Sequence, residues 1–241
     1  MQLDTRPTIH LLALDQFPIF YQLQIEEALL RADDRNWCIL NSGTSPAIVM
    51  GISGVHEKLI NPQLMMKQPV PLIRRFSGGG TVFVDRNTFF ATWICNTFQF
   101  DVCCCPKKIH EWTAGFYQKA FLGFDMALRE NDFVIGERKW GGNAQYLCRG
   151  RWLHHTSMLW DYDPENMDYL LMPAKVPAYR QSRGHSDFLC TLREYFSSVL
   201  DIKEAIIDTL HAQFDVKIGS LSEISEILQK PHRQATCFVR A

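Results

Sequence analysis

The chain lacks the features that mark several large classes of protein. Its 241 residues carry a formal net charge of −1, which gives no electrostatic reason to expect nucleic acid or an anionic membrane as a partner. No apolar run approaches the roughly 20 residues of a membrane-spanning helix, and the first residues resemble neither a signal peptide nor a transit peptide. Repeats and low-complexity tracts are also absent. We therefore expect a soluble, cytoplasmic protein, or an organellar one whose leader has been removed.

Several common site motifs are missing as well. There is no G-x-x-x-x-G-K-[ST] phosphate loop and no G-x-S-x-G nucleophile elbow. Among the eight cysteines, Cys103, Cys104 and Cys105 are contiguous, which is not the C-x-x-C spacing of a zinc or redox site, so no metal site is expected. Four others stand singly among apolar residues and are predicted to be reduced core side chains: Cys38, Cys95, Cys190 and Cys237.

The most informative segment places two arginines before three consecutive glycines. It reads Arg74-Arg75-Phe76-Ser77-Gly78-Gly79-Gly80-Thr81-Val82-Phe83. The glycines leave backbone without Cβ cover and can adopt positive φ, while guanidinium groups offer planar forks for a carboxylate or a phosphate. The segment is either a binding loop for an anionic ligand or a tight structural turn.

A second segment sets a lysine before glycines. Lys139 follows a polar turn and precedes Gly141, Gly142 and Asn143. Such a lysine is commonly a solvated charge. Facing a glycine-lined pocket, however, it could hold carboxylate and phosphate oxygens together and stabilise negative charge that develops during acyl transfer.

A third segment contains adjacent histidines in a predicted strand. Alternate residues of a strand share a face, so His155 and Ser157 are expected to point one way, and His154 and Thr156 the other. No Asp, Glu and Cys set accompanies them, which argues against zinc.

Hydrophobic periodicity predicts strands in the middle of the chain and helices towards both ends. Helices are expected over residues 19–32, 107–129, 186–199, 203–214 and 221–229, the first with Glu26 and Glu27 on its polar side. Strands are expected over residues 37–40, 47–50, 70–73, 81–84, 89–94, 133–135, 144–148, 152–160 and 216–218, with a hairpin turn at Arg149-Gly150-Arg151. No βαβ alternation or break in composition appears, so we expect one α+β domain over residues 1–241.

The three motifs occur in the order and spacing of a known family. The glycine segment, Lys139-x-x-Gly142-Asn143-Ala144-Gln145 and His155-x-Ser157-x-Leu159 resemble the lipoate–protein ligase A group of the biotin/lipoate A/B protein ligase superfamily, over roughly residues 20–215. The resemblance implies a mixed or antiparallel central sheet flanked by helices, and a catalytic role for Lys139. It also implies that lipoate or its adenylate contacts the other motif residues: Arg74, Arg75, Ser77, Gly78, Gly79, Gly80, Thr81, Val82, Phe83, Gly142, Asn143, Ala144, His155 and Ser157.

The reaction implied by the resemblance has two steps. ATP with Mg²⁺ activates lipoate as lipoyl-AMP, and a lysine amine of a lipoyl domain then displaces AMP. The implied acceptors are E2 subunits of 2-oxoacid dehydrogenases and the H protein of glycine cleavage. Relatives from bacteria continue into an accessory domain that this chain lacks, so we expect the transfer step alone, a separate accessory subunit, or a reduced stand-alone ligase.

Departures from the family pattern leave alternatives open. Val84, Gly141 and Thr156 replace a histidine, a serine and a glycine that are common in relatives. A transferase that uses a cysteine thioester, on Cys148 or Cys190, is one alternative. A non-catalytic lipoate-binding protein is a second. Biotin attachment is a third, although the lysine motif fits the lipoate branch better.

Overall fold

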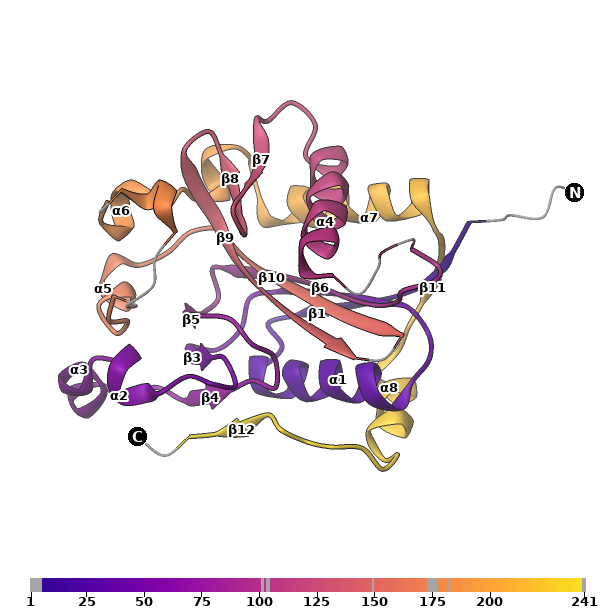
Figure 1. The fold of residues 1–241 in the computed structure, drawn as a ribbon, viewed down its shortest axis with the longest axis horizontal. Helices are drawn as coiled ribbons and strands as arrows, with labels where there is room; N and C mark the ends of the chain where they lie inside the picture. Colours follow the sequence, from indigo (N-terminus) through magenta and orange to yellow (C-terminus); the bar gives the residue numbers. More distant parts are fainter. Residues whose placement is uncertain are drawn as a thin grey trace, which may run out of the picture.

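Two β-sheets carry the fold (Figure 1). The structure is a computed structural model that describes residues 6–100, 102, 105–148, 150–172, 177–181 and 183–239. The predictions for the run of cysteines and for the hairpin turn fall partly on Cys103, Cys104 and Arg149, which lie outside these described residues. In the described part, no helix combines the length and the apolar character needed to cross a lipid bilayer.

The larger sheet has eight strands in the order β11-β1-β2-β6-β10-β9-β8-β7. β1 pairs in parallel with β2 and β11, and the other neighbours pair antiparallel, so the sheet is mixed. Its strands are β1 (Thr8–Asp15), β2 (Trp37–Ser42), β6 (Thr88–Asn96), β7 (Met126–Arg129), β8 (Asp132–Ile135), β9 (Arg138–Cys148), β10 (Arg151–Leu159) and β11 (Asp215–Ile218).

The smaller sheet has the order β12-β4-β3-β5 and holds the glycine segment. Its strands are β3 (Ala47–Met50), β4 (Leu72–Arg74), β5 (Thr81–Val84) and β12 (Cys237–Phe238). The glycine segment connects β4 to β5, which lie on either side of β3. The loop therefore has to cross the end of β3.

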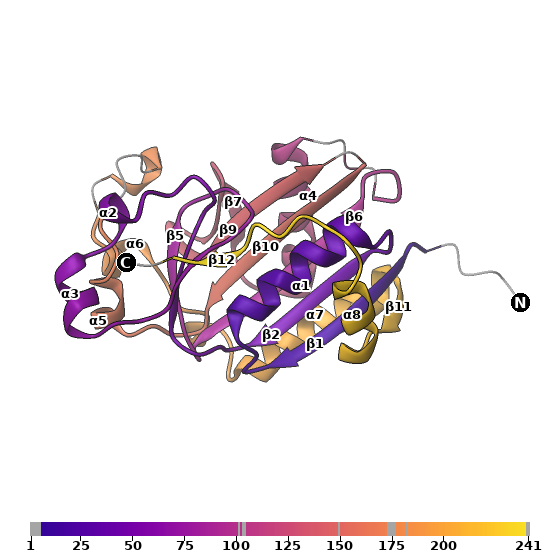
Figure 2. The ribbon, with the colours of Figure 1, turned by 90° about the horizontal axis from the view of Figure 1, so that it is seen from below.

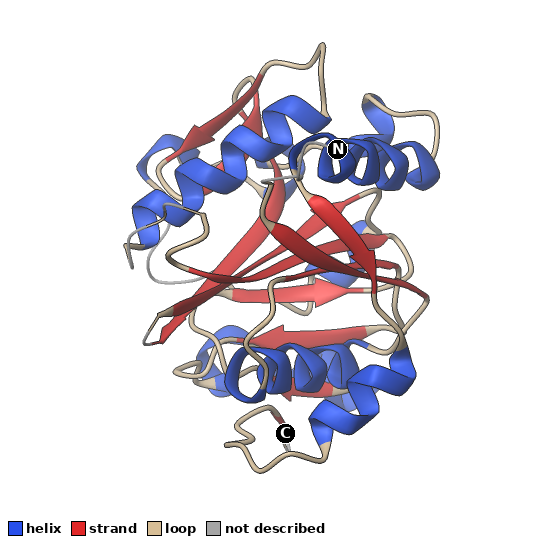
Figure 3. Ribbon diagram, turned by 90° about the vertical axis from the view of Figure 1, so that its right-hand side faces the viewer, coloured by secondary structure: helices blue, strands red, loops and turns tan. Residues whose placement is uncertain are grey.

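Helices cover both faces of the larger sheet (Figure 3). α1 (Ile19–Ala32) and α8 (Leu221–Leu228) lie on one face, and α4 (Pro106–Ala120) and α7 (Val199–Gln213) on the other (Figure 1). The short helices gather at the end of the molecule far from the N-terminus: α2 (His56–Leu59), α3 (Pro62–Lys67), α5 (Pro164–Met167) and α6 (His185–Phe188). Two 3₁₀ turns, η1 (Ala178–Arg180) and η2 (Leu192–Glu194), complete the described helices. The predicted α+β architecture is confirmed.

The predicted polar side of α1 is wrong as a solvent face, because Glu26 and Glu27 are both buried. Glu26 faces the larger sheet, where it accepts hydrogen bonds from Thr92 and His155, whereas the C-terminal segment runs along α1 (Figure 2) and covers Glu27. Glu27 accepts hydrogen bonds from the backbone N–H groups of Ala235 and Thr236 and from Arg31. A buried carboxylate needs such donors, and here the end of the chain supplies them.

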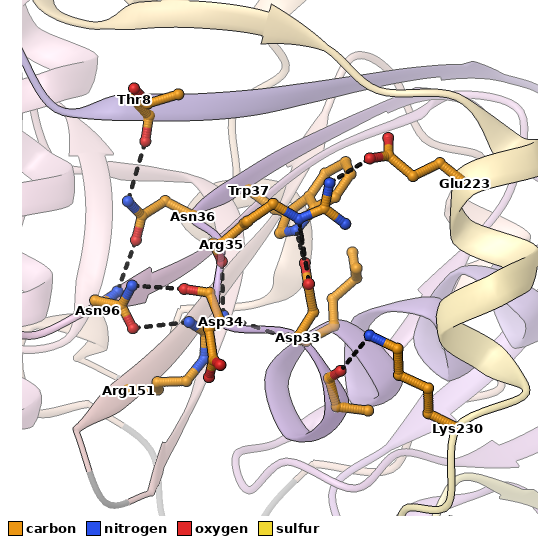
Figure 4. Close-up of polar contacts among 12 residues, drawn as sticks. Thr8, Asp33, Asp34, Arg35, Asn36, Trp37, Asn96, Arg151, Glu223 and Lys230 are labelled. Atoms are coloured by element: carbon orange, nitrogen blue, oxygen red, sulfur yellow. Dashed lines mark hydrogen bonds and ion pairs between the residues drawn. The ribbon is translucent and has the colours of Figure 1, made fainter.

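A polar network fastens α8 to the junction of α1 and β2 (Figure 4). Arg35 forms ion pairs with Asp33 and Glu223, and Asp33 also accepts a hydrogen bond from the indole N–H of Trp37 at 2.6 Å. The buried Arg151 donates to the Arg35 carbonyl at 2.8 Å. Residues distant in sequence are thus held at one corner of the larger sheet.

Two predicted helices differ from the structure. The helix expected over residues 107–129 ends at Ala120, because Gly123 adopts φ +94° and the chain then forms β7. The helix expected over residues 186–199 is replaced by α6 and η2. There, the Cys190 N–H donates to the Lys139 carbonyl in β9 rather than within a helix.

Candidate functional site

A bulge in β9 sets the direction of Lys139. Phe133 of β8 pairs with Gly141, and the next residue, Val134, pairs with Lys139, so Trp140 is an extra residue in β9. Trp140 packs in the core beside α4, while Lys139 lines two cavities. Such bulges re-aim side chains next to sites. Lys139 thus follows a turn at residues 136–137, as the sequence predicts, and is the second residue of β9.

The glycines after Trp140 are required by close packing. A Cβ on Gly141 would lie 2.8 Å from the Ser157 carbonyl oxygen, and one on Gly142 would lie 3.2 Å from Ser157 Oγ. The family serine that Gly141 replaces would therefore meet the β10 backbone in this geometry.

The two cavities meet at Lys139. The first, of about 130 Å³, lies between α1, β5, β9 and β10, and the second, of about 280 Å³, extends towards α5, η1 and α6. Six residues line both cavities: Gly80, Thr81, Val82, Lys139, Gly142 and Ser157. An elongated ligand could thus place one half in each cavity and its middle at the lysine.

The first cavity has an apolar wall and a polar wall. Its apolar wall comes from α1, the smaller sheet and β6 of the larger sheet, and it includes Ile19, Leu23, Val49, Val84 and Phe90. These residues belong to one buried cluster. An aliphatic chain would be well matched to this wall.

A buried relay of hydrogen bonds forms the polar wall. Glu26 Oε2 accepts from His155 Nδ1 at 3.0 Å, and Glu26 Oε1 accepts from Gln22 and Thr92 at 2.9 and 2.7 Å. Because the carboxylate only accepts, Nδ1 of His155 carries the proton of this hydrogen bond, and Nε2 of the same ring lies within hydrogen-bond distance of Ser77 Oγ at 3.3 Å. The relay ties α1, β10 and the glycine segment together.

Arg75 is committed to its own loop. Its Nη2 donates to the carbonyls of Gly78 and Gly80 at 2.6 and 2.9 Å, and its Nε donates to Ser77 Oγ at 3.0 Å. Burial lowers the pKa of Arg75 to about 10, so the guanidinium is still cationic at neutral pH. The planar fork that the sequence assigns to an anionic ligand instead holds the glycine loop.

Gly79 and Gly51 show why the loop needs glycine. Gly79 has φ +96°, and a Cβ there would lie 2.8 Å from Arg75 Nη2. A Cβ on Gly51 would lie 2.4 Å from the Gly79 carbonyl oxygen. The expected positive φ is thus found at one of the three glycines, Gly79, while the close approach is by protein backbone.

Lys139 is held by a carboxylate. Its Nζ donates to Asp132 Oδ1 at 2.6 Å, and Asp132 Oδ2 accepts from the Tyr179 hydroxyl at 2.9 Å. Burial and the Asp132 carboxylate raise the pKa of Tyr179 far above its ordinary value, so the phenol stays a donor. The ammonium group is held by Asp132, and the Lys139 side chain remains about one-fifth exposed.

The alternation predicted for β10 is confirmed. His155 and Ser157 line the first cavity, whereas the His154 side chain points towards α4, where Nδ1 accepts from Gln145 at 3.1 Å. Burial lowers the pKa of His154 well below its ordinary value, and His110 and His155 add to this effect.

Most of the predicted site residues are brought together. Those that line at least one cavity are Arg75, Gly80, Thr81, Val82, Phe83, Lys139, Gly142, Asn143, Ala144, His155 and Ser157. Arg74, Ser77, Gly78 and Gly79 line neither of the two cavities. Ser77 is fully buried inside the relay, and Arg74 donates from Nη1 to the Ile52 carbonyl at 3.4 Å.

The candidate nucleophilic cysteines line neither cavity. Cys148 packs against the core on the α1 face, and its thiol donates to the Arg151 carbonyl at 3.6 Å. Cys190 is buried, and burial raises its pKa to about 11, which disfavours the reactive thiolate. Cys38, Cys95, Cys190 and Cys237 form no disulfide, as predicted, but Cys237 is exposed rather than a core side chain.

Sequence reasoning missed the acids that organise the site, Glu26 and Asp132, and it also missed Arg180 in the second cavity. Both acids could have been noticed as carboxylates in apolar surroundings, Glu26 within the helix α1 and Asp132 at the first residue of the strand β8. For Arg180, which lies in a short 3₁₀ turn, no local signal exists.

The site offers no cage for Mg²⁺. Within the described ranges, no group of three His, Cys, Asp or Glu side chains could hold a metal ion. The acid that lines the second cavity, Asp132, has both oxygens engaged by Lys139 and Tyr179. Mg²⁺ would have to arrive with nucleotide phosphates, and we assign it no step.

Comparison with known proteins gives a consistent result. Residues 18–215 match the family described as Lipoyl protein ligase A/B catalytic domain. The chain is 24% identical over 245 residues to inactive lipoate–protein ligase 2 of Plasmodium falciparum. This match covers 77% of the present chain and 63% of the relative. It is 29% identical over 175 residues to lipoate-protein ligase A of Blochmanniella pennsylvanica, and this match covers 69% of the present chain and 49% of the relative. The chain thus spans about half to two-thirds of these relatives.

Solved structures share the fold. A lipoate-protein ligase A bound with ATP superposes with a TM-score of 0.72 at 18% identity, covering 94% of this chain and 95% of the other. A bi-partite lipoate protein ligase from Thermoplasma acidophilum, studied with its E2 lipoyl domain, gives 0.69 at 18% identity and covers 93% and 92%.

Proposed function

Because the chain belongs to the lipoyl protein ligase A/B catalytic domain family, we propose that it attaches lipoate to a lysine of a lipoyl domain through lipoyl-AMP. The proposal rests on one observation, which is that Lys139 lines both cavities at the place where they meet. Lipoyl-AMP has an aliphatic tail and a nucleotide joined at an acyl-phosphate linkage. The tail would occupy the first cavity and the nucleotide the second, with the linkage at the ammonium group.

Lys139 would act on the charge that the reaction creates. Attack by an acceptor amine on the acyl carbonyl produces an oxyanion, and departure of AMP leaves a phosphate anion. An ammonium group fixed by Asp132 is preorganised to stabilise both, without a protein nucleophile. Glu26 and His155 would set the shape of the acyl cavity, and Arg75 would hold the glycine loop in its binding conformation.

The two steps of the reaction can be divided between a catalytic domain and an accessory domain. We propose that its two sheets act as one catalytic domain, and that an accessory domain, where the activation of lipoate by ATP requires one, is supplied by a separate subunit. In support, the archaeal ligase with the same fold is bi-partite. E2 lipoyl domains would be the acceptors, as the pairing of that ligase with its E2 lipoyl domain suggests.

A second candidate function is non-catalytic binding of lipoate. It is favoured by one relative, which is called an inactive lipoate–protein ligase. The intact Lys139–Asp132 pair supports catalysis instead. A cysteine-thioester transferase has less support, because Cys148 and Cys190 line neither cavity.

A single assay with four arms separates these functions. The protein is incubated with a lipoyl domain and with lipoate plus Mg-ATP, preformed lipoyl-AMP, octanoyl-carrier protein, or lipoate alone. Modified acceptor is detected by intact mass, and binding of lipoate by calorimetry. Modification in the first two arms indicates a complete ligase, and modification from lipoyl-AMP alone indicates the transfer step.

Other outcomes would contradict the proposal. Modification only from octanoyl-carrier protein, lost in Cys148→Ala or Cys190→Ala, would establish the transferase. Lipoate binding without modification in any arm would establish the non-catalytic protein.

A further inference from the structure

One guanidinium in the second cavity has no acidic partner. Arg180 lines this cavity and is only 5% exposed, yet none of the ion pairs among the described residues includes it. Its Nη2 is buried and finds no hydrogen-bond acceptor. A buried cation without a counter-ion is costly, which suggests that an anion completes the arrangement.

The side chain of Arg180 is nevertheless held in place. Its Nε donates to the Arg183 carbonyl at 2.9 Å, and its guanidinium lies 4.7 Å from the ring centroid of Phe188, which also lines the cavity. η1 ends at Arg180, and the left-handed conformation of the next residue, Gln181 (φ 51°), turns the chain there. The group is therefore preorganised rather than mobile.

Comparison with the other buried arginines makes Arg180 distinctive. Arg75 also lines a cavity, but its donors are used by carbonyls of the glycine loop. Arg151 lines neither cavity and donates to Asn96 and to two backbone carbonyls. Among the described buried arginines, Arg180 is thus the one that combines a cavity position with an unused buried N–H group.

The charges around Arg180 favour an anionic ligand. Lys139 lines the same cavity, and Arg183 is close enough to lower the pKa of Arg180, an effect that adds to that of burial. Asp132, the acid of this cavity, acts on this pKa in the opposite direction, but its two oxygens already accept hydrogen bonds from Lys139 and Tyr179. The apolar remainder of the lining includes Leu170 and Leu171, which suit a flat, uncharged ring system.

We propose that Arg180 is the phosphate-binding residue of the second cavity and contacts the phosphate of a nucleoside monophosphate, the leaving half of the acyl adenylate. This inference rests on the proposed function. Arg180 would take over the role that the sequence assigns to Arg74 and Arg75. Its planar fork can donate two hydrogen bonds to phosphate oxygens, opposite the single ammonium group of Lys139.

Binding of AMP and adenosine to the whole chain tests the inference, because the two differ only in the phosphate. Calorimetry is expected to show that the wild-type protein prefers AMP, and that Arg180→Gln lowers this preference by about 10- to 100-fold while adenosine affinity is unchanged. Arg180→Lys keeps the charge without the fork and is expected to lose several-fold. Arg193→Gln, an exposed arginine paired with Asp161, is the matched control and should keep the full preference.

Two results would overturn the inference: a wild-type protein that binds AMP no better than adenosine, or an Arg180→Gln protein with an undiminished preference. If Arg180→Gln fails to fold, as judged by circular dichroism, Arg180→Lys decides the matter by the same ratio. None of these measurements requires turnover. A protein that prefers AMP through Arg180 but modifies no acceptor would therefore contradict the proposed function alone.

Discussion

The Glu26 carboxylate on α1 and the His155 imidazole on β10 form a hydrogen bond of 3.0 Å inside the first cavity. Glu26 is 1% exposed and satisfies three donors at once. The pair joins the helix on one face of the larger sheet to the strand that carries the third sequence motif.

Replacement of Glu26 is expected to cost stability. In Glu26→Ala, the donors on Gln22, Thr92 and His155 lose their common acceptor in a buried place, so unfolding in urea should require about 2–4 kcal/mol less free energy. Glu223→Ala, which removes a half-exposed carboxylate paired with Arg35, should cost less than about 1 kcal/mol. Equal losses in the two variants would mean that the relay contributes nothing specific.

Loss of Lys139 is expected to abolish acyl transfer and leave the fold intact. Lys139→Ala removes the cation from the junction of the cavities, so the rate of transfer from lipoyl-AMP should fall at least about 100-fold. Its circular dichroism spectrum should match that of the wild-type protein. Lys217→Ala removes an exposed lysine paired with Asp215 and should transfer at the wild-type rate. Retained transfer by Lys139→Ala would exclude the assigned role.

Two neighbouring glycines are expected to differ sharply. Gly79→Ala forces a side chain into φ +96° and against Arg75, so it should destabilise the protein by about 2 kcal/mol or more and weaken lipoate binding. Gly78→Ala meets no atom within 4 Å and should stay within about 0.5 kcal/mol of the wild-type protein. Thermal unfolding and calorimetry measure both effects, and a similar response at the two positions would contradict the loop geometry.

Stability is expected to fall in mild acid because of His154. Burial lowers the pKa of this histidine in the folded protein, whereas in the unfolded chain it titrates near its ordinary value of about 6.5. Below that pH the unfolded chain binds a proton that the folded protein does not, so the free energy of unfolding should drop by up to about 1.4 kcal/mol per pH unit.

Urea unfolding between pH 7.5 and 5.5 tests the effect. His154→Gln should show a shallower slope over this range, whereas His211→Gln, an exposed histidine, should keep the wild-type slope. The same slope in all three proteins would rule out His154 as the source.

Local pattern was sufficient for the elements whose hydrophobic spacing is regular. The predictions for residues 19–32, 47–50 and 81–84 coincide with α1, β3 and β5. β1 has no predicted counterpart, although it lies inside the larger sheet. The order of motifs likewise identified the family, and most of the residues in these motifs line a cavity, because glycines and a lysine at fixed spacing reflect a shared backbone.

The predictions that failed concern side chains whose partners are distant in the sequence. Arg75 and Arg180 carry the same chemical group, and only the fold decides that one is consumed by carbonyls while the other keeps an unused donor. Glu27 resembles a solvent-exposed helix residue until the amides of Ala235 and Thr236 reach it. The spacing of residues along the sequence does not indicate which distant residues will become partners in the fold.

The pairing of β12 with β4 has a consequence for the order in which the molecule is made. β4 leads directly into the glycine loop, and its neighbour β12 comes far later in the sequence. Synthesis proceeds from the N-terminus, so a nascent chain exposes the β4 edge and leaves Glu27 paired with Arg31 but without the Ala235 and Thr236 amides until residues 235–238 leave the ribosome. Lipoate supplied to stalled nascent chains should therefore be bound only once residues 235–238 have emerged.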